Sequence, residues 1–235
     1  MRLWVGTSGF SYKEWKGHFY PEDLPASGML AYYGERLNSV EINNTFYRMP
    51  STKVLGDWGG KVPASFRFVL KASRKITHFK RLKPEAADEL GYLLDVSSEL
   101  GERRGPILFQ LPPNFKKDLE RLKDFLALFP DGFRAAFEFR NTSWFDEDVY
   151  DALREHNVAL VAADTGKDED PPVVATASYG YARLRKEVYE PGEIESWVER
   201  LTSPDWEDSF VFFKHEDEGA GPALAKTFRE LAASA

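Results

Sequence analysis

The sequence predicts an α/β protein of the (β/α)₈, TIM-like barrel class, and three observations support that prediction. The chain has 235 residues, close to the roughly 250 that are typical of such a barrel. Short apolar runs alternate with helical patterns, which favours parallel strands joined by right-handed crossovers. No linker, charge block or short repeat divides the chain, so we expect a single barrel domain over residues 1–235.

Eight apolar runs have the length and composition of buried strands. They lie at residues 3–5, 40–42, 66–71, 107–111, 133–139, 158–163, 181–184 and 210–213. Amphipathic spacing and capping residues predict helices near residues 29–37, 84–101, 119–129, 146–156, 193–201 and 224–231. A long aromatic loop follows the first run. Because residues 165–172 are polar and rich in proline, we expect the sixth helix to be short or missing.

Composition restricts the classes of function. The formal net charge is −7, which counts against broad electrostatic capture of nucleic acid but leaves room for a local basic groove. The chain has no cysteine, so disulfides, thiolate metal sites and cysteine nucleophiles are excluded. No apolar run approaches the roughly 20 residues of a membrane span, and the N-terminal residues lack the apolar core of a signal peptide. We therefore expect a cytoplasmic protein without a membrane partner; the oligomeric state is not predicted.

Polar residues end most of the predicted strands on the face that should point into the barrel. Side chains alternate along a strand, so polar groups late in a strand face the C-terminal mouth, where barrel active sites lie. Buried charges must be paired or must meet a ligand. The residues placed there are Glu41, Asn43, Lys71, Gln110, Glu138, Arg140, Asp164, Arg183 and Arg185, with Lys214 or His215 depending on the register.

Cations outnumber carboxylates in this set, which predicts a small anionic ligand such as a phosphate or carboxylate, because arginine binds either group in a bidentate manner. Lys71 is the candidate general base or Schiff-base amine. Glu138 and Asp164 are the candidate acid/base pair, with Glu41 as a further candidate catalytic residue. Arg140 and Arg183 would hold the anion. The alternative is a network of salt bridges that only closes the top of the barrel.

The first loop and the histidines each allow two interpretations. Tyr12 and Trp15 belong to an aromatic segment that forms either a lid over the pocket or a satellite hydrophobic cluster. His18, His78 and His215 fall in segments at the C-terminal face, where they could join the carboxylates in a metal site. No HExxH, GxSxG, Walker A or GxGxxG motif is present. A divalent metal is therefore possible but not favoured, no metal ligand is assigned, and the cofactor stays unknown.

Six segments together resemble the YecE-like family, also described as domain of unknown function 72. They are VGTSGFSYKEWKGHFYP, VEINNTFYRMP, ITHFKRL, LFQLPPNF, FEFRNTSWF and AADT, and the resemblance runs from about residue 3 to residue 230. It implies a TIM-like barrel and the location of a site, but no established activity. Recurrent polar positions of the family match Glu41, Asn43, Thr45, Tyr47, Lys71, His78, Gln110, Glu138, Arg140, Ser143, Trp144, Asp164 and Arg183.

The chain departs from the family pattern at two places on the same rim. Arg185 and Lys186 stand where many members have His-Gly, and Lys214 and His215 stand where many have Asn-Asn. Both changes add positive charge. They put a shared ligand geometry in doubt there and favour a more anionic partner.

Three functions remain open from the sequence. The first is an enzyme, such as a lyase, isomerase or hydrolase, that acts on a small anionic or polyhydroxy substrate by acid–base chemistry at the mouth. The second is a metal-assisted phosphoester or nucleic-acid hydrolase resembling barrel endonucleases. The third is a non-catalytic binding or scaffold protein in which the ionic ring is structural.

Overall fold

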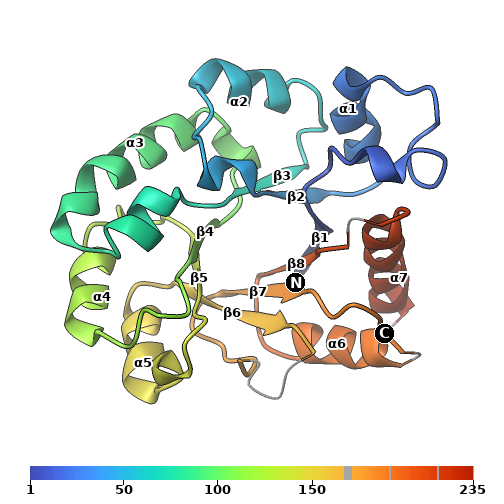
Figure 1. The fold of residues 1–235 in the computed structure, drawn as a ribbon. Helices are drawn as coiled ribbons and strands as arrows, with labels where there is room; N and C mark the ends of the chain where they lie inside the picture. Colours follow the sequence, from blue (N-terminus) through green and yellow to red (C-terminus); the bar gives the residue numbers. More distant parts are fainter. Residues whose placement is uncertain (167–170, 191, 216, 235) are drawn as a thin grey trace.

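Eight parallel strands form a nearly closed barrel, as the sequence predicts (Figure 1). The computed structural model describes residues 1–166, 171–190, 192–215 and 217–234. The order of the strands in the sheet is β3-β2-β1-β8-β7-β6-β5-β4. Their bounds are β1 (Arg2–Ser8), β2 (Ser39–Ile42), β3 (Arg67–Leu70), β4 (Ile107–Gln110), β5 (Ala135–Glu138), β6 (Ala159–Asp164), β7 (Tyr179–Leu184) and β8 (Asp208–Phe213).

The barrel closes between β3 and β4, where pairing is sparse. Isolated parallel bridges join Phe68 to Arg104 and Lys71 to Leu108. The amide of Gly105 donates to the Phe68 carbonyl, and the amide of Ala72 donates to the Leu108 carbonyl, both at 2.8 Å. We call this junction the β3–β4 seam. Lys71 thus lies on the seam, one residue beyond the end of β3.

Helices surround the strands in Figure 1 and agree with the predicted pattern at most positions. The Asp146 side chain caps α5 by accepting from the Asp148 amide, which decides between Asp146 and Ser143, the two caps that the sequence allows. A helix between β2 and β3 was not predicted, because Gly56 and Gly59 weaken its helical pattern. The helices are α1 (Met29–Gly34), α2 (Thr52–Gly59), α3 (Ala87–Ser98), α4 (Leu119–Leu126), α5 (Glu147–Glu155), α6 (Glu193–Thr202) and α7 (Ala220–Ser234).

The helix that was expected to be short or missing would lie in the connection from β6 to β7. Residues 171–178 of that connection contain no helix, and residues 167–170 lie outside the described part of the chain. None of the helices in the described ranges is long and apolar enough to cross a membrane.

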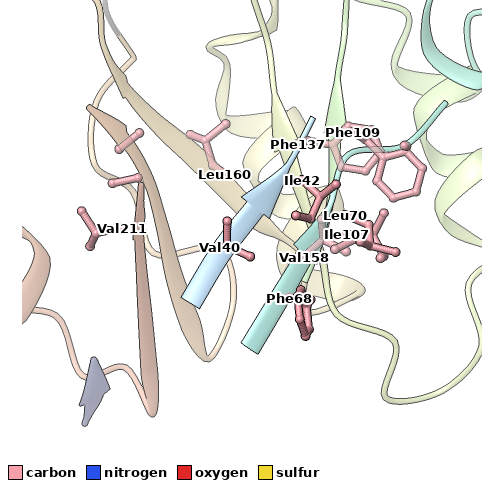
Figure 2. Packing of buried hydrophobic residues seen from close by; sticks show 14 of the residues in the cluster. Val40, Ile42, Phe68, Leu70, Ile107, Phe109, Phe137, Val158, Leu160 and Val211 are labelled. Carbon is pink, nitrogen blue, oxygen red and sulfur yellow. The ribbon is translucent and has the colours of Figure 1, made fainter. Parts of the chain in front are cut away.

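Apolar side chains pack in two layers on opposite sides of the strands. The outer layer lies between strands and helices, and Figure 2 shows part of it, including Val40, Phe68 and Phe137. The inner layer fills the barrel axis. It consists of Trp4, Val69, Leu108, Ala136, Ala159, Val161, Tyr179, Tyr181, Phe210 and Phe212. The inner layer excludes water from the barrel centre and separates the polar groups at its two ends.

An ionic cluster closes the N-terminal end of the barrel. Asp208, with a side chain only 1% exposed, accepts from Arg2 at 2.7 Å and from the Trp4 indole at 3.0 Å, and also pairs with Arg134. Because these donors come from β1 and from the residue preceding β5, one carboxylate ties together distant parts of the barrel floor.

We expect Asp208→Asn to lower the free energy of unfolding by about 2–4 kcal/mol, because it removes the negative charge from a buried, hydrogen-bonded ion pair. Glu207→Gln is the matched control. Glu207 pairs with the same Arg134 at 3.4 Å, but its side chain is 67% exposed, so we expect a loss below about 1 kcal/mol. Urea unfolding measures both, and equal losses would contradict a structural role for the buried carboxylate.

Candidate functional site

A buried arginine stands at the centre of the polar groups at the C-terminal end of the barrel. Arg183 on β7 donates through Nη2 to Glu41 Oε1 of β2 at 2.8 Å, and through Nη1 to Glu138 Oε2 of β5. The three side chains are at most 2% exposed. Guanidinium remains protonated in proteins, so it can compensate two carboxylates in a buried interior.

Glu41 has further donors on both of its oxygens. The Ser8 hydroxyl at 2.7 Å and the Asn43 amide at 3.0 Å donate to Oε1, and the Tyr181 hydroxyl at 2.6 Å donates to Oε2. Burial alone would raise the pKa of Glu41, but the charge of Arg183 and these hydrogen bonds hold the pKa below its ordinary value. Glu41 is therefore a fixed carboxylate at neutral pH.

Glu138 draws a second set of donors toward the mouth. Gln110 donates to Oε2 at 2.7 Å, while Arg185 at 3.0 Å and Arg140 at 3.3 Å donate to Oε1. Burial opposes ionisation of Glu138, yet the charges of Arg183, Arg185 and Arg140 hold its pKa well below the ordinary value. A carboxylate in this state is a weak proton donor and serves to orient the arginines.

Lys71 enters the same network through an amide. Its Nζ donates to Gln110 Oε1 at 2.9 Å and lies 4.4 Å from the centroid of the Phe46 ring. Burial lowers the pKa of Lys71 to about 8, and the charge of Arg183 acts in the same direction. A sizeable fraction of the amine is therefore neutral near physiological pH, which suits proton abstraction or attack on a carbonyl.

His78 stands beside this lysine. Its ring packs edge-to-face on Phe46 with centroids 4.9 Å apart, and Nδ1 lies 2.9 Å from the Thr77 hydroxyl. Burial lowers the pKa of His78, as do the charges of Lys71, Arg140 and Arg81. The lowered pKa keeps the imidazole neutral at physiological pH, in a state that can accept or pass on a proton.

A cavity of about 390 Å³ opens beside the network and is lined by two of its cations, Arg140 and Arg185. The side chain of Arg140 is 39% exposed and that of Arg185 is 16% exposed. The three arginines outnumber Glu41 and Glu138 by one charge, and Lys71 raises the excess to two when it is protonated. The lining residues are Pro113, Glu138, Phe139, Arg140, Thr142, Phe145, Ala163, Thr165, Pro171 and Arg185.

The predicted face of the strands is confirmed for most of the site. Phe68 and Leu70 on β3, Phe137 on β5 and Phe139 directly after it point to the outer layer. The alternating positions, which the structure turns toward the barrel interior and mouth, are Glu41, Asn43, Lys71, Gln110, Glu138, Arg140, Arg183 and Arg185.

The interior position predicted for Asp164 is wrong. Ala159 and Val161 belong to the inner layer, so the alternation along β6 turns Asp164 toward the helices. There Asp164 accepts from the Trp197 indole of α6 at 2.9 Å and from the Gly166 amide at 3.1 Å. The structure does not bring Asp164 to Glu138 as an acid/base pair.

Two aromatic residues predicted to bind a ligand are fully buried and offer it no surface. Trp15 packs against Tyr12, Phe19 and Tyr20 beneath the first loop, which matches the satellite-cluster interpretation. Trp144 stacks on Phe139 and donates its indole N–H to the backbone. Tyr12 is partly buried, and its hydroxyl donates to the Ser8 carbonyl at 2.7 Å.

The remaining predicted ligand residues lie at the rim. Lys214 and His215 line a shallow hollow beside Arg185, and His215 Nε2 lies 2.5 Å from the Lys186 carbonyl. Tyr47 is 67% exposed. Two partners of Glu41, namely Ser8 and Tyr181, were not predicted from the sequence. Tyr181 could have been found, since it shares its strand face with Arg183.

The histidines and carboxylates of the described ranges are not grouped as metal ligands would be. Within the described ranges, no group of three or more histidine and carboxylate side chains is placed to hold a metal ion. Glu41 and Glu138 already direct their oxygens at arginine and other donors. His78 and His215 contact different neighbours, Phe46 and Tyr189 respectively.

Comparison with known proteins identifies the family. The model of the family described as protein of unknown function DUF72 matches residues 4–235. The chain belongs to the DUF72 family. The resemblance read from the sequence is thereby confirmed.

Solved structures agree with this assignment. A DUF72 protein from Thermotoga maritima is 27% identical with a TM-score of 0.87, and the alignment covers 99% of this chain and 100% of that one. A DUF72 protein from Enterococcus faecalis is 19% identical with a TM-score of 0.78, over 100% and 98% of the two chains. A D-psicose 3-epimerase is 10% identical with a TM-score of 0.55 over 100% and 96%, which shows a shared fold alone.

A curated relative extends the family comparison. The UPF0759 protein YunF from Bacillus subtilis is 26% identical over 162 residues. The match covers 63% of the DUF72 chain and 54% of the relative, so it spans about half of that protein's length.

Because of Lys71, the free energy of unfolding of this DUF72 protein should change with pH in the alkaline range. An unfolded lysine keeps its proton up to about pH 10.4, whereas folded Lys71 releases it near pH 8. The unfolded state thus binds more protons between these values, and stability rises with pH there. We expect wild type to gain up to about 3 kcal/mol relative to Lys71→Met across this window.

Urea unfolding of wild type and variant at pH 7.5, 9 and 10.5 measures the difference. Lys75→Met removes an exposed lysine from the same loop and should leave the difference constant with pH. A constant difference for Lys71→Met as well would show that the Lys71 amine is not held in a desolvated position.

Proposed function

We propose that the protein binds a small ligand bearing a phosphate or carboxylate at the C-terminal mouth of the barrel, and that Lys71 acts on it by proton transfer or imine formation. The observation that carries this proposal is the excess of cations around two buried carboxylates. A cation excess in a partly buried site is costly unless an anion completes it. Hydroxyl groups on the ligand would suit Gln110 and Asn43 nearby.

Arg140 and Arg185 are the groups that support anion binding. Both line the cavity, and both use one nitrogen to contact the same oxygen of Glu138. No described residue accepts a hydrogen bond from the terminal nitrogens of Arg140. Two guanidinium groups directed by one carboxylate form a pre-organised fork for a phosphate or carboxylate.

Lys71 supports the chemical part of the proposal. Its amine is the group in the network that changes protonation near neutral pH, since Arg183 keeps Glu41 and Glu138 ionised. In this proposal the two glutamates position the cations, and His78 is available to carry a proton to or from the neighbourhood of Lys71. Asp164 has no part in it, because it faces α6.

We expect inorganic phosphate to raise the melting temperature of wild type and to lose most of that effect in Arg140→Ala, because Arg140 supplies accessible N–H donors. Arg154→Ala is the matched control. The Arg154 side chain is 40% exposed and ion-paired like that of Arg140, but it lies on α5 away from the mouth. Thermal shifts over a phosphate series measure both, and equal losses in the two variants would argue against an anion site at the mouth.

A ketone that carries a phosphate tests the role of Lys71. We expect dihydroxyacetone phosphate followed by borohydride to leave a reduced adduct on Lys71, detected by peptide mass spectrometry. Acetone should label exposed lysines without favouring Lys71, and Arg140→Ala should reduce the adduct about tenfold or more. Phosphate binding without any adduct on Lys71 would leave a binding protein and remove imine formation from the proposal.

A further inference from the structure

Two aromatic side chains at the rim of the mouth are exposed to an unusual degree. Tyr47 and Phe79 are each 67% exposed, and Phe79 is the sole phenylalanine among the large exposed apolar residues of the described ranges. Tyr47 follows the short helix after β2, and Phe79 ends the π-helical turn after β3 (Lys75–Phe79). Exposed rings that gather at one place are typical of binding surfaces.

One guanidinium joins the two rings. Arg74 lies 5.3 Å from the centroid of Tyr47 and 5.3 Å from that of Phe79. We call these three side chains the rim platform. Arg74 is itself exposed, so the platform offers ring faces and a cation to solvent together.

The rim platform is linked to Lys71 through the ring of Phe46. Tyr47 packs edge-to-face on Phe46 with centroids 5.0 Å apart, and Phe46 lies under the Lys71 amine and against His78. A single aromatic ring, that of Phe46, thus separates the platform from the Lys71 amine.

The loop that carries Phe79 is held in a defined conformation. Arg81 and Leu82 both adopt left-handed backbone angles, with φ of 48° and 60°, which non-glycine residues rarely adopt. Leu82 is buried, and the neighbouring Lys80 pairs with Glu89 of α3. Strained backbone of this kind persists where surrounding contacts hold it, and it is enriched at ligand sites.

The segment that follows β3 has positive charges and no negative ones. Residues 71–84 contain Lys71, Arg74, Lys75, Lys80, Arg81 and Lys83 and no acidic residue, in a chain whose net charge is −7. The loop after β4 (111–117) also has lysines and no acid. Such a concentration of cations would attract an anion to this half of the mouth.

We propose that the rim platform binds a planar ring, and that the ligand of the mouth is a ring joined through a spacer to an anionic group, which is the chemistry of a nucleotide. This rests on the proposed function, because Arg140 and Arg185 take the anion. The ring stacks on Tyr47, Phe79 and the Arg74 guanidinium, as bases stack on aromatic side chains and arginine elsewhere. The spacer then crosses Lys71.

Calorimetric titrations with five probes test this assignment: phosphate, ribose 5-phosphate, phenyl phosphate, AMP and adenosine. We expect AMP to bind at least tenfold tighter than ribose 5-phosphate, since stacking adds to the anion contact. Phenyl phosphate, which has a ring but no spacer, should bind more weakly than AMP. If phenyl phosphate binds as tightly as AMP, the ring subsite stands, but the spacer is overturned and the ligand is a simple aryl anion.

The double variant Tyr47→Ala/Phe79→Ala should remove the advantage of AMP and leave the affinity for ribose 5-phosphate unchanged. Tyr92→Ala is the matched control, because Tyr92 is 52% exposed on α3; we expect no change from it. If AMP binds no tighter than ribose 5-phosphate, the ring subsite is overturned and anion binding stands.

Adenosine, which has a ring but no phosphate, tests the ring subsite independently of the proposed anion site. If phosphate and ribose 5-phosphate do not bind while adenosine binds and loses affinity in the double variant, the ring subsite stands and the proposed function fails. If none of the five probes binds, both fail.

Discussion

The pairing of Arg183 with Glu41 and Glu138 is the interaction on which the rest of the mouth depends. It places a permanent cation between two carboxylates above a buried apolar layer, so both carboxylates stay ionised. Glu138 then directs Arg140 and Arg185 toward the cavity. Because the two glutamates stay ionised, the groups that can gain or lose a proton near neutral pH are Lys71 and its neighbours.

The ionic ring combines the two interpretations that the sequence left open. Its inner part, around Arg183, is fully buried and closes the barrel as a salt-bridge plug would. Its outer part, with Arg140 and Arg185, is exposed to the cavity and has hydrogen-bonding capacity left over. A structural core that holds an accessible outer group in place is a common arrangement for a binding site.

The alternation of side chains predicted the site wherever a strand contrasts bulky apolar residues with polar ones, as in the run ending at Glu138. It failed at Asp164, because alanines on both faces of β6 give no contrast from which to choose a face. Sequence reasoning also missed Asp208, which begins its strand, and did not predict that Phe79 would be exposed. Burial of an aromatic residue depends on what packs over it, and local sequence does not contain that information.

The sparse β3–β4 seam has a consequence for the basicity of Lys71. Hydrogen-bonded ladders hold the other neighbouring strands, whereas two isolated bridges hold this junction in the described chain. Local opening costs least where such bonds are fewest. Water entering there would reach the Lys71 amine and return its proton affinity toward that of a free lysine. The pKa of the Lys71 amine thus depends on how tightly the β3–β4 seam stays closed.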